Sequence, residues 1–373
     1  MPTPDTTRGY AALVESLDER GLLSPQWRAV WRELPRHLFI PSEIWRQEPD
    51  RCVPVEPDGW WPLVTSDEPV VIQVDDGTKD GPDIATSSNS KPSMVALMLG
   101  LLDLDSSHRV LEIGTASGHV AALLARHLGD DGRVHSIELD PVLARLAADQ
   151  LARAGHAPRL RQGDGALGWP EAAPFDRIIS TCAVRRVPRA WVEQVRPYGH
   201  IVFPLHRDFW SGAVVRLTRR PDGTARGRFH GGASYMLMRA HRAGDVPAVD
   251  TSTARFSPAA LDPAGLLTLG AALYIGEMLP GVSLHHARTD EGVRVWAQAR
   301  DGSAATGVAH EAIAYGPRDL WHEIADAHRD YVHQGSPGAE EFGLTVADGR
   351  HHVWLDDPRN VIGVTAQPPR TGR

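Results

Sequence analysis

Residues 110–119 read VLEIGTASGH, and this stretch predicts a strand, a tight turn and the start of a helix. An apolar run precedes Gly114 and Gly118, and the helix-like HVAALLARHL follows at 119–128. Glycines let a backbone approach a ligand closely, and a helix N-terminus offers unpaired N–H groups. A dinucleotide site would read G-x-G-x-x-G. Here the pattern is E-x-G-x-x-x-G, and the acidic Glu112 disfavours a pyrophosphate and favours a cationic ligand.

The region around this turn alternates between strand-like and helix-like segments. Runs rich in β-forming residues occur at 109–113, 133–138, 158–162, 175–181 and 200–205, and helical patterns separate them. Such alternation predicts a parallel sheet with right-handed crossovers. The runs 212–220 and 227–239, joined by a Pro-Asp-Gly turn, predict a closing antiparallel hairpin. We therefore expect an α/β domain over residues 76–244.

Two further regions flank this domain. In the N-terminal segment, residues 1–75, the apolar residues Trp27, Val30, Trp31 and Leu34 follow helical spacing after the capping residue Ser24, so a helical segment is expected. The polar stretch 244–258 is typical of a linker. Beyond it, residues 245–373 alternate between helix-like and strand-like runs, which predicts an appended α+β domain.

Composition narrows the class of partner. A hydrophobic content of 42% with 23% charged residues is typical of a globular protein, and the formal charge of −8 provides no basic field for nucleic acid. The two cysteines, Cys52 and Cys182, lie far apart, as is typical of a reducing cytosol. No signal-like start and no window of about 20 apolar residues is visible. These features predict a cytoplasmic protein with no nucleic-acid or membrane partner.

Two histidine patterns resemble metal sites. His322-Glu323 begins a zinc-like H-E-x-x-H pattern, but Asp326 replaces the second histidine. The pair His351-His352 lies on an expected strand and is interpreted as a solvated surface pair. No metal site is expected.

Acidic residues recur where the expected strands end, and ligands bind at that edge of an open parallel sheet. Glu138 ends the second strand, and its carboxylate can accept both hydroxyls of a ribose. Asp164, within Gly163-Asp164-Gly165, can accept from the exocyclic amine of an adenine. With Glu112 beside a sulfonium or ammonium group, this order favours S-adenosylmethionine. The alternative is an α/β domain whose acidic turns bind nothing.

The quoted turn together with VHSIE, QGDGALGW, APFDRIIST and VRPYGHIVFPL resembles the protein-L-isoaspartate O-methyltransferases, and ELPRHLFIP at 33–41 extends the likeness upstream. The resemblance implies a Rossmann-like α/β fold of the class I S-adenosylmethionine-dependent methyltransferases, with N-terminal helices and the appended C-terminal domain. It implies that Glu138 binds the ribose and that Asp164 with Gly165 binds the adenine. The residues that it assigns to the methionine part of the cofactor are Glu112, Gly114, Thr115, Ser117 and Gly118.

The substrate signature of that family, T-I-S-x-P, appears here in altered form. Aligning Pro92 puts Ser90 on the family's active serine and Ser88 on its threonine, whereas Asn89 replaces an apolar residue. A carboxylate with a pKa near 4 is already ionised, so catalysis reduces to positioning, and Ser90 would hold the non-attacking oxygen. Additional substrate contacts are expected from Ser87, Asn89 and Thr181. A linker remains the alternative for this serine run.

The two main enzymatic interpretations take a peptide or protein carboxylate as the substrate, and methylation of another group is left as a further alternative. The long C-terminal region, with four aromatics that can anchor a polypeptide (Trp296, Trp321, Tyr331 and Trp354), is similar to a subgroup acting on ribosomally made modified peptides such as lanthipeptides and graspetides. That likeness implies methylation of an aspartate side chain, cyclisation to aspartimide and opening to isoaspartate. The alternatives are isoaspartyl repair with an accessory domain and a catalytically silent peptide-binding scaffold.

Overall fold

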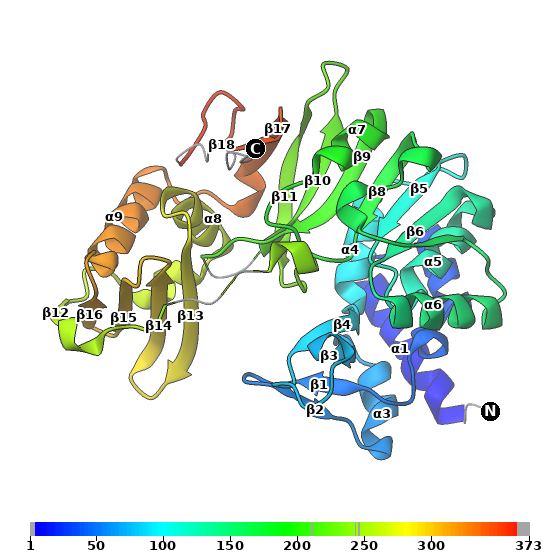
Figure 1. The fold of residues 1–373 in the computed structure, drawn as a ribbon, viewed down its shortest axis with the longest axis horizontal. Helices are drawn as coiled ribbons and strands as arrows, with labels where there is room; N and C mark the ends of the chain where they lie inside the picture. Colours follow the sequence, from blue (N-terminus) through cyan, green and yellow to red (C-terminus); the bar gives the residue numbers. More distant parts are fainter. Residues whose placement is uncertain (1–3, 210–211, 243, 245–246, 364–373) are drawn as a thin grey trace. The chain divides into compact units, whose positions relative to one another are not determined.

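The computed structural model describes residues 4–209, 212–242, 244 and 247–363 of the 373. The chain divides into two compact units (Figure 1). The first unit comprises the chain up to Cys182 together with Pro188–Phe203, and the second comprises Ala183–Val187 and the chain from Pro204 onward. Each unit has its own sheets and helices, described in turn.

The first unit contains a parallel sheet of five strands in the order β9-β8-β5-β6-β7. All five predicted strand runs are confirmed, and β9 begins at Val195, ahead of the expected start at residue 200. The strands are β5 (Val110–Ile113), β6 (Val134–Glu138), β7 (Arg159–Gln162), β8 (Phe175–Ser180) and β9 (Val195–Leu205). The helices between them are α4 (Pro92–Leu102), α5 (His119–Leu128), α6 (Pro141–Arg153) and α7 (Arg189–Gln194).

The strand order fixes where a ligand can bind. The chain places β6 on one side of β5 and β8 on the other. The connections after β5 and β8 therefore diverge, and the crevice that they open at the carboxyl ends of the strands is the usual ligand site of such sheets.

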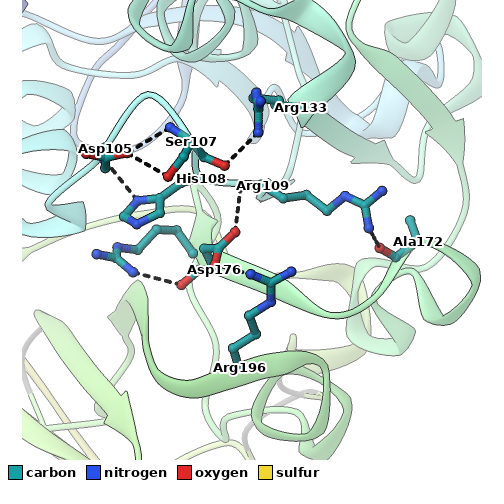
Figure 2. Close-up of polar contacts among 9 residues, drawn as sticks. Asp105, Ser107, His108, Arg109, Arg133, Ala172, Asp176 and Arg196 are labelled. Atoms are coloured by element: carbon teal, nitrogen blue, oxygen red, sulfur yellow. Dashed lines mark hydrogen bonds and ion pairs between the residues drawn. The ribbon is translucent and has the colours of Figure 1, made fainter.

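The opposite edge of this sheet is occupied by a polar network (Figure 2). Asp176 accepts from the backbone N–H of Arg109 at 2.7 Å and from the guanidinium of Arg196 at 2.9 Å. Arg133 donates to the carbonyl of Ser107 at 2.6 Å. These bonds join the segments that enter β5, β6 and β8, so this edge has a structural role.

A second, antiparallel sheet in the first unit has the order β2-β1-β3-β4. It comprises β1 (Trp45–Gln47), β2 (Cys52–Pro54), β3 (Val70–Val74) and β4 (Ala85–Asn89), and it accompanies α1 (Pro4–Glu19), α2 (Pro25–Glu33) and α3 (Pro57–Val64). Ile40, Leu63, Val70 and Ile72 form its core together with Leu143 of α6.

This sheet corrects one expectation and resolves one alternative. Residues 1–75 are not uniformly helical, because the β-branched run Val70-Val71-Ile72 is buried in β3. The serine-rich run, for which a linker was the alternative, is a strand, since β4 pairs with β3 through Val71↔Ser88. The helix expected after Ser24 is confirmed: the Ser24 hydroxyl accepts from the N–H of Trp27 at 3.3 Å.

The second unit contains two antiparallel groups of strands. In the first, β10 (Gly212–Arg219) and β11 (Ala225–Ala233) form the expected hairpin, and β17 (Phe342–Ala347) and β18 (Arg350–Leu355) form another. Strand β11 pairs with β17 in the register Ala225↔Val346. Because of that pairing, the first hairpin groups with the C-terminal region, and the compact units divide at residue 203 rather than at 244.

The other group is a five-stranded sheet in the order β12-β16-β15-β14-β13. Its strands are β12 (Arg255–Pro258), β13 (Val282–Thr289), β14 (Gly292–Ala299), β15 (Ala304–Val308) and β16 (Glu311–Tyr315), and its helices are α8 (Leu269–Met278) and α9 (Leu320–His333). The Trp321 ring of α9 packs so closely on Gly307 that a Cβ there would lie 2.0 Å from it. The expected linker 244–258 is therefore partly ordered, because β12 pairs with β16; residues 245–246 lie outside the described residues.

The expected solvated histidine pair is also corrected. His351 is half-buried, and its Nε2 accepts from the backbone N–H of Val187 at 3.1 Å. Burial, followed by the charges of Arg207 and Arg186, lowers the pKa of His351 to about 3. No helix within the described ranges combines the length and the hydropathy that a membrane crossing requires.

Candidate cofactor and acceptor site

The turn between β5 and α5 has a backbone that few residues can adopt. Gly114 and Gly118 have φ values of 92° and 84°, and Ala116 has a φ of 48°. A Cβ on Gly114 would lie 3.0 Å from the hydroxyl oxygen of Thr181. The N–H of Gly114 donates to the carbonyl of Ile137 at 2.9 Å, so the turn is attached to β6. The glycines therefore serve a tight turn at the expected ligand edge.

Glu112 lies under this turn with no exposed surface. Its Oε2 accepts from the hydroxyl of Ser136 at 2.5 Å, and that hydroxyl also lies 2.6 Å from the one of Thr115. The other oxygen, Oε1, is buried without a hydrogen-bond partner in the described part of the chain. Burial, together with the nearby charge of Glu138, raises the pKa of Glu112 to about 8. An unpartnered buried carboxylate is stabilised by a cation nearby, which fits the charge of S-adenosylmethionine.

Glu138, at the end of β6, has one backbone donor on each oxygen. Oε2 accepts from the N–H of Ala116 at 2.8 Å, and Oε1 accepts from the N–H of Asp140 at 3.0 Å. Burial raises the pKa of this half-buried carboxyl. Each carboxylate oxygen can accept a second bond, so the orientation that the two amides impose suits a pair of adjacent hydroxyls.

The turn after β7 supplies the residues expected at an adenine. Asp164 is exposed, and its Oδ1 accepts from the N–H of Ala166 at 2.9 Å. Gly165 is buried, and its carbonyl accepts from the indole N–H of Trp191 at 2.8 Å. Two leucines close in sequence to Glu138 and Asp164 are exposed: Leu139 by 40% and Leu167 by 65%. Exposed apolar side chains beside hydrogen-bond acceptors fit a flat aromatic base with polar edges.

The serine-rich strand β4 has two different faces. Ser87 and Asn89 are buried, whereas Ser88 and the following Ser90 are half-buried. The amide of Asn89 donates to the hydroxyl of Ser117 at 3.0 Å, so Asn89 faces the glycine turn. The Ser90 hydroxyl makes no hydrogen bond within the described residues. Ser88 and Ser90 are thus the hydroxyls that remain accessible to an acceptor.

Thr181 contacts the glycine turn, because its hydroxyl donates to the carbonyl of Gly114 at 2.7 Å. Sequence reasoning missed Gln73 and Asp140. The Gln73 side-chain amide donates to Oδ2 of Asp140 at 3.2 Å. An aspartate before a proline at a helix start is a recognisable capping signal, and Asp140 does accept from the N–H of Val142 at 2.8 Å. No sequence pattern indicates the role of Gln73.

The family model and the similar proteins that match this chain carry the same description. The family model described as protein-L-isoaspartate(D-aspartate) O-methyltransferase matches residues 66–240. A protein-L-isoaspartate O-methyltransferase of Methanopyrus kandleri (strain AV19) is 37% identical over 234 residues, which cover 62% of this chain and 91% of that protein. One from Anaeromyxobacter sp. (strain Fw109-5) is 36% identical over 226 residues, 60% of this chain and 79% of the relative.

A solved structure with the same description, protein-L-isoaspartate O-methyltransferase, shares the fold over nearly the whole chain. The two align with a TM-score of 0.55 and 20% identity, covering 93% of this chain and 100% of the other. The alignment therefore extends into the C-terminal region of this chain.

Proposed function

Because this chain belongs to the protein-L-isoaspartate O-methyltransferase family, we propose that it methylates the free carboxylate of isoaspartyl residues in proteins or peptides. Membership makes it an S-adenosylmethionine-dependent methyltransferase with the Rossmann-like α/β fold of class I, as the sequence predicted. The hypothesis of a silent peptide-binding scaffold is set aside, because the family is one of enzymes.

The observation that carries the proposal is the bond between Asn89 and Ser117, 3.0 Å long. It joins the strand that ends beside Ser90 to the turn assigned to the cofactor. The acceptor carboxylate is ionised at neutral pH, so no general base is required. The Ser90 hydroxyl donates to one carboxylate oxygen and leaves the other free to form the new O–C bond. When bound, S-adenosylmethionine would supply the methyl group from its sulfonium and would leave as the neutral thioether.

A second candidate is the methylation of a normal aspartate in a ribosomally made modified peptide, leading to aspartimide. Its support is the altered signature, in which by the stated resemblance Asn89 replaces an apolar residue, but Asn89 is buried and donates to Ser117 of the glycine turn. The C-terminal region does not favour it, because the solved structure named above aligns over 93% of this chain. Of the four aromatics considered as peptide anchors, Trp321, Tyr331 and Trp354 are buried and only Trp296 is exposed.

The two candidates are separated by a matched pair of hexapeptides that differ only in the linkage of one aspartate. With S-adenosylmethionine, the isoaspartyl peptide should gain a methyl ester and the aspartyl peptide should remain unchanged, as read by mass spectrometry. Ser90→Ala should lower the single-turnover rate on the isoaspartyl peptide. Methylation of the aspartyl peptide alone, followed by loss of methanol so that the product is one water lighter than the starting peptide, would replace the proposal by aspartimide formation.

A further inference from the structure

Strand β4 is joined to the cofactor edge by two separate sets of hydrogen bonds. The first is the bond from the Asn89 amide to the Ser117 hydroxyl, between residues that are 5% and 2% exposed. Ser117 lies in the glycine turn, so this link reaches the part of the site assigned to the methionine end of the cofactor.

The second set reaches the end assigned to the ribose. The Thr86 hydroxyl on β4 lies 3.1 Å from Oε1 of Gln73 on β3, and the Gln73 amide donates to Oδ2 of Asp140 at 3.2 Å. The backbone N–H of Asp140 donates in turn to Oε1 of Glu138 at 3.0 Å. Four residues thus connect the acceptor strand with the carboxylate expected to bind the ribose.

These links are polar where packing alone would favour apolar side chains. Asn89 and Gln73 are 5% and 7% exposed, and burying an amide is costly unless its hydrogen bonds are made. The pairing of β3 with β4 is also irregular on both sides of Gln73, between Val71 and Val74. Directional bonds define the position of a strand more narrowly than apolar contact does.

We propose that Asn89 and Gln73 are positioning residues that couple cofactor binding to the order of the acceptor strand. A bound cofactor fixes the glycine turn and Glu138, and the two links transmit that order to β4 and so to Ser88 and Ser90. Reciprocally, a bound acceptor tightens cofactor binding by the same factor. The importance of Ser88 and Ser90 rests on the proposed function, whereas the coupling itself does not.

The first test needs no peptide substrate. Amide hydrogen exchange of residues 85–91 is measured with and without S-adenosylhomocysteine, in the parent protein, in Asn89→Leu and in Gln73→Leu. In the parent, the ligand should slow exchange in this segment by roughly fivefold or more, the lower end of typical coupling. In both variants this protection should fall, while residues 110–119 remain protected because the ligand still contacts them.

A double variant separates positioning from stability. Asn89→Leu alone leaves the buried Ser117 hydroxyl unpaired, whereas Asn89→Leu with Ser117→Ala removes both partners, which restores much of the lost stability. The coupling should stay lost in the double variant. Ser66→Ala is the control, since among the described residues that hydroxyl donates only to the Leu63 carbonyl, at 2.8 Å. Equal protection of residues 85–91 in the parent and in Asn89→Leu, or its recovery in the double variant, would overturn the proposal.

A second readout uses the isoaspartyl hexapeptide. Its presence should tighten S-adenosylhomocysteine binding in the parent and not in Asn89→Leu, and the variant should show a raised KM for the peptide. If the parent does not bind the hexapeptide, the proposed function fails, and hydrogen exchange still decides the coupling.

Discussion

Cofactor binding should release a proton from Glu112. Its pKa is raised to about 8, so about nine in ten molecules of the free protein carry the protonated carboxyl at pH 7. S-adenosylhomocysteine brings an ammonium group, and a cation near this side chain favours the carboxylate. Binding at pH 7 should therefore release close to one proton per site.

The expected magnitude follows from linkage. Removing the proton at pH 7 costs about 1.4 kcal/mol, one pKa unit, so the affinity should rise about tenfold between pH 7 and pH 9. The free energy of unfolding depends on pH in the opposite direction. In the free protein the raised pKa favours the protonated form, so the contribution of Glu112 to stability is complete below the ordinary pKa of 4.5 and is lost as the pH rises through about 8. In Glu112→Gln, the pH dependence of the affinity and the pH dependence of stability that come from this carboxyl should both disappear.

The assay is titration calorimetry in two buffers of different protonation enthalpy, which counts the protons released. Glu138 also has a raised pKa and would contribute when ribose hydroxyls bind it. 5′-Methylthioadenosine keeps the ribose and lacks the ammonium, so the difference between the two ligands isolates the contribution of Glu112. The reasoning is refuted if both ligands release the same number of protons, or if Glu112→Gln releases as many as the parent.

Three further outcomes are expected. Glu138→Ala should weaken S-adenosylhomocysteine binding by roughly 1–3 kcal/mol in calorimetry, because charge-assisted bonds are lost; an unchanged affinity would contradict the ribose assignment. Ser90→Ala should leave that affinity intact and slow methyl transfer in single-turnover assays, and a larger loss in Ser88→Ala would place the orienting hydroxyl there. Arg36→Ala should lower the free energy of unfolding by roughly 3–5 kcal/mol in urea, because two hydrogen bonds from a charged group, each worth about 1.5–3 kcal/mol, are lost: the fully buried guanidinium donates to the carbonyls of Ser66 and Glu68, both at 3.0 Å; a small change would show that these carbonyls find other donors.

The sequence predicted the parallel sheet and its ligand edge because both depend on local patterns. Short apolar runs between helical segments define β5 to β9. Glu138 ends β6 and Asp164 follows β7, and the carboxyl ends of parallel strands lie at the same edge of a sheet. Strand β4 was missed because Ser and Asn clusters favour loops locally, and only pairing with the buried β3 makes this run extended.

The side-chain partners within the site depend on contacts distant in sequence. Asn89 and Ser117 are 28 residues apart, and Gln73 and Asp140 are 67 apart, so no local spacing indicates either bond. Strands β11 and β17 pair although more than a hundred residues separate them, so local patterns do not indicate this pairing either. The position of the unit boundary follows from it.

Because the side chains of β4 alternate between two faces, the length of the segment that joins β3 to β4 decides which side chains face the acceptor. Asp75 accepts from the N–H groups of Asp83 and Ile84, at 2.9 Å each, and so closes the segment between β3 and β4 at a fixed residue count. Deleting one residue there would slip the pairing and exchange the two faces. Ser88 would then turn inward and Asn89 outward, so a change that touches neither ligand would inactivate the site as fully as replacing its residues, whereas substitutions that keep both the length and Asp75 would be tolerated.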